Sequence, residues 1–328
     1  MVLCLFPNSK GEVIVGFGEK ISIIVDDIFR KHHIFHAKHV IEDKNEDSTH
    51  SQVQEVIFSR SSKLFAALAN EKFVLIWKRI LGSETIYDTW DFHRIIGPFK
   101  KNLLFLEITP NDENVIFCDV AGNVYCYHIE TKTEGLLFTC ISTILSMSIC
   151  HNGRFIATGD RDARIRITKF PNNCEIESFC VGHNGPITSL LFTKTFLISG
   201  SFDGVVKIWD YHTSKCISSI DLALKMDIEN PVVQAIHHHC RIKRIAVVVK
   251  KSYKILWFDY NKTGTVEATF VCELPIQLNI ISSCWDFHGL FWVGSDNNDP
   301  PIVMFFIDLE MPKVDYFIKS YKDICCGC

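Results

Sequence analysis

The sequence lacks any run of about eighteen uncharged apolar residues, the length at which a membrane-spanning helix becomes a candidate. The N-terminal stretch MVLCLFPNSKGE contains a short apolar run, but it has neither a basic leader nor a cleavage-site pattern. These absences argue against a membrane anchor and a secretory signal. We therefore expect a soluble intracellular protein that makes no membrane contact.

An excess of basic charge is also lacking. The chain has 34 basic and 38 acidic residues and a formal net charge of −4, which argues against a protein that grips nucleic acid by bulk electrostatics. Local basic paths stay open at Lys100-Lys101, Arg241/Lys243/Arg244 and Lys250-Lys251. The simpler interpretation is that most of these residues solubilise exposed turns.

The motifs of nucleotide and acyl-transfer chemistry are absent as well. There is no Gly-x-x-x-x-Gly-Lys-Ser/Thr loop, no Gly-x-Ser-x-Gly elbow and no Gly-x-Gly-x-x-Gly motif opening a helix after a strand. Carboxylate pairs such as Asp26-Asp27 and Asp160/Asp162 lie at expected turns, where acidic residues usually close Asx turns. We expect a protein that is not an enzyme and binds no cofactor. An active site would still be possible if the fold were ring-shaped and titratable residues converged at one opening of its central channel.

Cysteine is plentiful, with fourteen residues, but its placement does not indicate a disulfide framework. Most cysteines lie inside strand-like segments, such as those around Cys118, Cys126 and Cys284, and buried free thiols are the expected state. The tail Cys325-Cys326-Gly327-Cys328 is similar to a double prenylation signal, yet the GTPase body that this signal requires is missing. A tail without function is the preferred interpretation, and metal capture is the alternative.

A second cluster, His237-His238-His239-Cys240, is expected in a turn between strands at Val232–Ile236 and Ile245–Val249. Neighbouring residues of an extended chain point to opposite faces, and a second Cys or His pair with zinc-ligand spacing is missing. We therefore predict no metal site in this chain.

The strongest positive signal is the run Gly200–Asp210, GSFDGVVKIWD, preceded by Gly182-His183. It is a nearly complete WD repeat, the unit that builds one blade of a β-propeller. Asp203-Gly204 suits a tight turn between two strands. We predict that His183, Ser199, Asp203 and Trp209 form a buried, hydrogen-bonded tie.

Similar units recur along the whole chain when the search accepts two short apolar strands around a polar turn. Their end positions are Val25, Trp77, Tyr127, Thr168, Trp209, Trp257 and Phe305, separated by 52, 50, 41, 41, 48 and 48 residues. A closed ring would bury the sheet faces and shorten the exposed edges. The spacing predicts an all-β, seven-bladed β-propeller of WD repeats, forming a single domain over residues 1–328. An unclosed sandwich or two smaller β domains are the alternatives, and the way the ring closes stays open.

The first blade is expected to use Val2–Phe6, Glu12–Phe17, Lys20–Val25 and an outer strand near His32–His39. The segment that follows, Glu42–Gln52 (EDKNEDSTHSQ), has almost no large apolar side chains and cannot form a buried strand. We predict a flexible acidic loop at residues 42–52.

The most specific segment begins at Ala157-Thr158-Gly159 and continues as DRDARIRIT to Thr168. Strand alternation places Arg164 and Arg166 on one face and the isoleucines between them on the other. The planar guanidinium fork of arginine pairs well with carboxylates, so a neighbouring subunit with acidic side chains could bind here. The alternative is internal pairing of the arginines with Asp160, Asp162 or Glu175.

The strings GDRDARIRI and IESFCVGH together resemble the WD-repeat, non-catalytic subunit of tRNA guanine-N7 methyltransferase, most sharply over residues 144–212. This resemblance implies a seven-bladed propeller that binds and stabilises a separate catalytic subunit as a heterodimer. The catalytic subunit would use S-adenosylmethionine to methylate a guanine in the tRNA variable loop. The motif match implicates Arg161, Arg164 and Arg166, with Asp160 and Asp162, in partner binding.

The resemblance further implies that tRNA is met mainly through the complex, and that the protein is nuclear, with the cytoplasm as an alternative. One departure is Ala163, where the family often has an acidic residue, and the family's large charged tail is not evident after Pro312. The competing function is a general WD-repeat scaffold, such as the substrate receptor of a ubiquitin ligase.

Overall fold

The computed structural model describes most of the chain. The described residues are 3–8, 10, 12–24, 32–36, 52–80, 89–171, 174–239, 244–274, 280–285, 290–295, 302–307 and 314–319. The predicted acidic loop at 42–52 lies outside them except for Gln52, and so do Cys240 and the C-terminal cysteines. Among the helices of the described residues, none has the length and apolar character needed to span a membrane.

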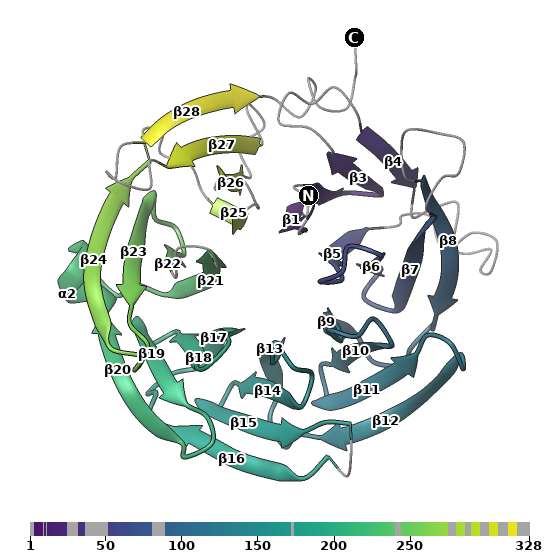
Figure 1. Cartoon of the computed structure of the whole chain (residues 1–328), viewed down its shortest axis with the longest axis horizontal. Helices are drawn as coiled ribbons and strands as arrows, with labels where there is room; N and C mark the ends of the chain where they lie inside the picture. The colour runs from purple at the N-terminus through teal and green to yellow at the C-terminus, as the bar shows by residue number, and fades with distance from the viewer. Residues whose placement is uncertain are drawn as a thin grey trace.

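Within the described residues, the strands form seven four-stranded antiparallel sheets, each made of four strands that are consecutive in the sequence. Figure 1 shows the sheets around a central opening, with the first strand of each sheet innermost and the fourth outermost. The prediction of an all-β WD-repeat propeller is confirmed, and there are as many sheets as the sequence has repeat units.

The sheets follow one another around the ring in chain order. The first three contain β1 (Leu3–Pro7), β2 (Val13–Phe17), β3 (Lys20–Ile24) and β4 (His32–His36); β5 (Val53–Phe58), β6 (Leu64–Ala69), β7 (Phe73–Ile80) and β8 (Thr89–Ile96); and β9 (Leu103–Ile108), β10 (Asn114–Asp119), β11 (Asn123–His128) and β12 (Thr133–Thr139). The next two contain β13 (Ile144–Ile149), β14 (Phe155–Asp160), β15 (Arg164–Lys169) and β16 (Ile176–Val181); and β17 (Ile187–Phe192), β18 (Leu197–Ser201), β19 (Val205–Asp210) and β20 (Lys215–Asp221). The last two contain β21 (Val233–His239), β22 (Arg244–Val249), β23 (Lys254–Tyr260) and β24 (Val266–Glu273); and β25 (Ile280–Trp285), β26 (Leu290–Ser295), β27 (Ile302–Ile307) and β28 (Val314–Lys319). The short helix α2 (Leu222–Met226) links β20 to β21.

Burial along the strands follows their position in the ring. Every residue of β6 and β10 is buried, because these second strands lie between two neighbouring sheets and have no face in water. The outer strand β12 is mostly exposed. The core is therefore a series of apolar layers between sheets.

Neighbouring sheets approach closely where the second strand has a glycine. A Cβ atom at Gly159 of β14 would collide with Ile187 of the next sheet, and one at Gly200 of β18 would collide with Val233. Glycine at these positions lets the first residue of the next inner strand pack against the sheet.

Inner strands are also joined by hydrogen bonds from a backbone N–H to a side-chain oxygen of an adjacent sheet. The pairs are Leu106 N to Glu55 Oε2 at 2.9 Å, Phe192 N to Ser148 Oγ at 3.3 Å, Ile236 N to Ser189 Oγ at 3.1 Å and Leu5 N to Ser282 Oγ at 3.0 Å. The last pair joins β1 to β25 and closes the ring. Each terminal sheet is complete in itself, so the ring closes by side-to-side contact rather than by a shared sheet.

The predicted WD tie is confirmed in the sheet of β17 to β20. Trp209 Nε1 donates to Ser199 Oγ at 2.8 Å, and Ser199 Oγ lies 2.7 Å from His183 Nε2. His183 Nδ1 lies 3.0 Å from Asp203 Oδ2. With a proton on Nδ1, His183 donates to Asp203, while Ser199 accepts from Trp209 and donates to His183 Nε2, so each polar atom of the tie has a partner.

The sequence pattern predicted a turn at the histidine cluster, and this prediction is wrong for its three histidines. Strand β21 runs through His237, His238 and His239. His237 Nε2 lies 2.8 Å from Ser283 Oγ, and His238 Nε2 lies 3.0 Å from the hydroxyl of Tyr260. Burial lowers the pKa of His237 to about 4 and is the main cause of a similar value at His238. The first two histidines therefore serve packing between and within sheets.

The cysteines of the described residues are free thiols, as expected from their placement in strands. The buried ones are Cys118, Cys140, Cys150, Cys180, Cys272 and Cys284. Burial raises the pKa of Cys180 to about 12 and that of Cys272 to about 11, which keeps these thiols protonated and unreactive.

Asp203 couples the WD tie to pH. Burial alone would raise the pKa of its carboxyl, but hydrogen bonds from His183 and from the N–H of Asn184 outweigh burial and lower the pKa to about 2, from an ordinary value of 3.8. The charged form is therefore favoured by folding. Its stabilisation is complete above pH 4 and is lost as the pH falls towards 2.

We expect Asp203→Asn to lower the free energy of unfolding by about 2 kcal/mol at pH 7. The gap between this variant and the unmodified chain should narrow as the pH falls from 5 to 3. Urea unfolding at pH 7, 5 and 3 measures it, with Asp162→Asn, an exposed carboxylate in the matching turn of the preceding sheet, as the control. A gap that is unchanged from pH 7 to pH 3 would contradict the role assigned to Asp203.

Candidate partner-binding site at the turn between β14 and β15

The turn that follows β14 is held by its first residue. Asp160 Oδ1 accepts hydrogen bonds from the backbone N–H groups of Asp162 and Arg164, both at 2.9 Å. This is an Asx-type turn, which the carboxylate of Asp160 closes from inside. Burial raises the pKa of Asp160, although the two backbone hydrogen bonds oppose the shift. Asp160 therefore shapes the turn, whereas Asp162 is exposed at its tip.

Ala163 occupies the left-handed position of this turn, with φ of 64°. The matching positions in the neighbouring sheets are Gly122 and Gly204, with φ of 83° and 74°. A left-handed alanine costs about 1 kcal/mol, which the surrounding hydrogen bonds must offset. The hydrogen bonds to Asp160 therefore determine the conformation of the turn, and the backbone preference of alanine does not.

Arg161 and Arg164 project from this frame. Both side chains are exposed, and within the part of the chain that the structure describes neither forms an ion pair with a carboxylate. Glu175, one of the expected internal partners, lies instead 3.7 Å from Lys169 Nζ. The two guanidinium groups are therefore available to carboxylates of another molecule.

Arg166 is placed differently from the other two arginines. Its guanidinium carbon lies 4.5 Å from the ring centroid of Phe138, and its Nη1 donates to the carbonyl oxygen of Thr139 at 3.2 Å. Both partners belong to β12 of the preceding sheet. Arg166 does share a strand face with Arg164, as alternation predicts, but its guanidinium is engaged in packing between sheets and is less open to a partner.

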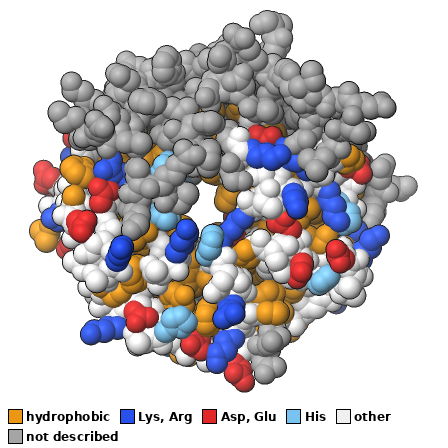
Figure 2. All heavy atoms as spheres, in the orientation of Figure 1, with side chains coloured by type: hydrophobic (Ala, Val, Ile, Leu, Met, Phe, Trp, Pro, Cys, Tyr) orange, Lys and Arg blue, Asp and Glu red, His pale blue; other side chains and the backbone are white. Residues whose placement is uncertain are grey.

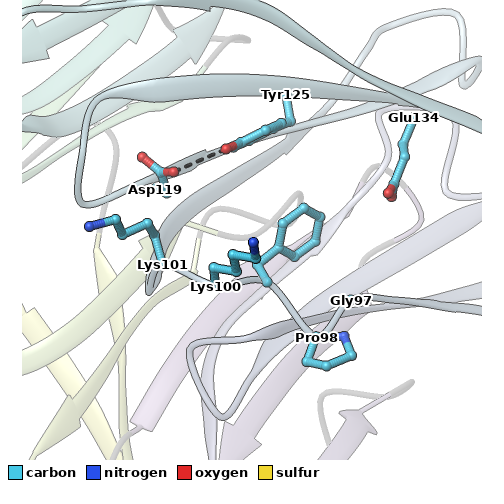
Figure 3. Close-up of a pocket in the computed structure, with 8 residues that line it drawn as sticks. Gly97, Pro98, Lys100, Lys101, Asp119, Tyr125 and Glu134 are labelled. Carbon is cyan, nitrogen blue, oxygen red and sulfur yellow. Dashed lines mark hydrogen bonds between the residues drawn. The ribbon is translucent and has the colours of Figure 1, made fainter.

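The lysine pair that could form a local basic path borders a cavity of about 340 Å³. Figure 3 shows Lys100 and Lys101 at this cavity together with Asp119, Tyr125 and Glu134. Asp119 accepts a hydrogen bond from the Tyr125 hydroxyl at 3.1 Å. Two carboxylates beside two lysines disfavour a phosphate group here, and Figure 2 shows basic and acidic side chains interspersed on the face drawn.

Comparison with known proteins agrees with the motif at this turn. Residues 136–297 match the family model described as tRNA methyltransferase TRM82 WD40 domain. The resemblance seen in the sequence is confirmed.

Two relatives show the extent of the similarity. The chain is 25% identical over 288 residues to the Mus musculus tRNA (guanine-N(7)-)-methyltransferase non-catalytic subunit WDR4, covering 80% of this chain and 65% of the relative. It is 31% identical over 212 residues to the Danio rerio protein of the same description, covering 61% of this chain and 51% of the relative. The chain thus spans about half to two thirds of these relatives, which are named as non-catalytic, in agreement with the prediction that it is not an enzyme.

A solved structure shows the fold alone. A chain in the crystal structure of a mitotic checkpoint complex superimposes with a TM-score of 0.72 at 12% identity, covering 97% of this chain and 87% of that one. The propeller fold occurs in proteins of many functions, so the fold alone does not define a binding site.

The different positions of the arginines predict different effects on stability. Arg166→Glu should lower the free energy of unfolding by about 2 kcal/mol, because it removes the contact with Phe138 and places a carboxylate near the carbonyl oxygen of Thr139. Arg161→Glu/Arg164→Glu should change it by less than about 0.5 kcal/mol, since both side chains are exposed. Urea unfolding of the isolated chain measures both variants. Equal losses in the two would show that the exposed arginines are also part of the packing.

Proposed function

We propose that this chain is the non-catalytic subunit that binds and stabilises the catalytic subunit of a tRNA guanine-N7 methyltransferase as a heterodimer. In this role it supports formation of N7-methylguanosine in the tRNA variable loop. The observation that carries the proposal is the exposed pair Arg161 and Arg164, without ion-pair partners among the described residues, on the turn whose sequence resembles the family.

The turn suits this role because its backbone is fixed before binding. Asp160 accepts hydrogen bonds from the backbone N–H groups of Asp162 and Arg164, and the N–H of Arg161 donates to the carbonyl oxygen of Thr143. The backbone of both arginines is therefore fixed, and little backbone entropy is lost when a partner docks. Each guanidinium can then take a carboxylate in a two-bond, planar arrangement. Such pairs give orientation as well as affinity.

Binding of this kind raises the activity of a partner by linkage. A scaffold that binds only the folded, competent form of the catalytic subunit stabilises that form by RT ln(1 + [L]/Kd), which is about 2.7 kcal/mol when the scaffold is present at 100 times Kd. The propeller need not touch the methyl group. S-adenosylmethionine binds to the partner in this proposal, tRNA is met mainly through the complex, and the assembly works in the nucleus.

The test is the affinity of the full chain for the catalytic subunit of the same organism. Arg161→Glu/Arg164→Glu should weaken binding about 100-fold or more, because two favourable charge pairs become repulsive. Calorimetry with the purified subunit measures this effect. The control is Arg154→Glu/Lys215→Glu, which reverses two exposed basic residues away from the turn, Arg154 lying at the opposite end of the same sheet.

Unchanged binding by the Arg161/Arg164 variant, with the fold intact, would contradict this assignment of the site. Failure of the unmodified chain to bind the catalytic subunit, or capture of ubiquitin-ligase components in its place, would contradict the proposed function itself.

A further inference from the structure

Large hydrophobic side chains are exposed on both sides of the arginine turn. The exposed fractions are 99% for Ile141, 66% for Val181, 57% for Phe202 and 38% for Val120. A single exposed apolar side chain is ordinary on a protein surface, but several in a row beside arginines need an explanation. None of these four residues was singled out from the sequence.

Hydrogen bonds place the first two apolar residues beside the turn. Thr143 Oγ1 donates to the carbonyl oxygen of Val120 at 3.3 Å, and the backbone N–H of Arg161 donates to the carbonyl oxygen of Thr143 at 3.0 Å. Ile141 lies in the same short loop as Thr143, between β12 and β13. Val120, Ile141 and Arg161 therefore occupy adjacent segments at one end of the strands.

The row continues on the other side of the turn. Val181 is the cross-strand partner of Arg164 in the register of β15 and β16. From Val181 the chain enters the loop to β17, and Phe202 N donates to Pro186 O of that loop at 2.9 Å. We call Val120, Ile141, Arg161, Arg164, Val181 and Phe202 the turn rim.

All segments of the turn rim lie at the same end of the strands. The turns after β10, β14 and β18 and the loops after β12 and β16 share one end because consecutive strands run antiparallel. The backbone hydrogen bonds named above fix these segments relative to one another. The turn rim is thus a preformed surface that spans three neighbouring sheets.

The charges of the turn rim indicate which kind of molecule could bind there. The carboxylate of Asp160 accepts hydrogen bonds within its own turn, and that of Asp203 is engaged by His183 and by the N–H of Asn184 in the loop after β16. Arg161 and Arg164 are therefore opposed mainly by the exposed Asp162. A second copy of the chain would bring arginine against arginine if the same surface paired with itself. Val120, Ile141 and Val181 are aliphatic and Phe202 is the one aromatic side chain of the turn rim, which disfavours single-stranded RNA because its successive bases would need several stacking surfaces.

We propose that the turn rim binds an acidic, amphipathic segment of the catalytic methyltransferase subunit. Carboxylates of that segment pair with Arg161 and Arg164, and its apolar side chains cover Ile141, Val181 and Phe202. Apolar anchors beside arginine are the usual composition of the energetically dominant part of a protein interface. This inference rests on the proposed function and adds the surface and the chemistry of the partner segment.

The experiment replaces each apolar anchor by serine in the full chain: Ile141→Ser, Val181→Ser and Phe202→Ser. Each variant should bind the purified catalytic subunit about tenfold or more weakly, since an apolar contact is lost without a change in charge. The matched control is Leu136→Ser, because Leu136 is 57% exposed but lies on the outer strand β12. Thermal unfolding of each variant verifies that the fold is kept.

Salt separates the apolar from the charged contribution. The loss caused by the serine variants should persist at 0.5 M NaCl, whereas the loss caused by Arg161→Glu/Arg164→Glu should shrink, because exposed charges are screened. If the serine variants bind like the unmodified chain while the arginine variant does not, the turn-rim proposal is overturned and the proposed function stands. If the unmodified chain does not bind the catalytic subunit, both fall.

Two further outcomes would also overturn the turn-rim proposal. One is self-association of the isolated chain that Ile141→Ser abolishes in sedimentation experiments, which would make a second copy the occupant. The other is tRNA binding by the isolated chain that the serine variants remove.

Discussion

The structure depends on one constraint, which is that a single four-stranded sheet of this chain cannot bury its own faces. The second strands β6 and β10 are buried along their whole length only because another sheet lies on each side. Close approach at Gly159 and Gly200, together with side-chain oxygens that accept N–H groups from the next inner strand, joins each sheet to its neighbour. The bond from Leu5 to Ser282 extends this rule across the two ends of the chain.

The surface available for binding lies at the ends of the strands, where residues do not have to be buried against a neighbouring sheet. A turn of the closed ring is stabilised by the sheet to which it belongs and by neighbouring loops. The hydrogen bond from the N–H of Arg161 to the carbonyl oxygen of Thr143 is an example. Such a turn can display arginines that form no ion pair within the described part of the chain, and an exposed isoleucine, without losing its shape. The non-catalytic role of the relatives fits a surface that is ordered before it meets a partner.

The sequence was most informative where one segment determines its own geometry. The tie from His183 through Ser199 to Trp209, the turn at Asp160 and the free thiols in strands all follow from local patterns, and the structure confirms them. Contacts between sheets could not be predicted, because they depend on which outer strand lies beside a residue. For this reason the sequence assigned Arg166 to partner binding together with Arg164. In the structure, the guanidinium of Arg166 packs on the ring of Phe138 in the preceding sheet.

The measurement that tests the account most directly is hydrogen–deuterium exchange of the full chain with and without the catalytic subunit. We expect slower exchange in the loop containing Ile141 and Thr143, in the turn around Arg161 and in the loop from Val181 to Pro186. The turn around Arg154, at the opposite end of the same sheet, should exchange as in the free chain. Protection confined to that opposite end or to the outer strands would contradict the account.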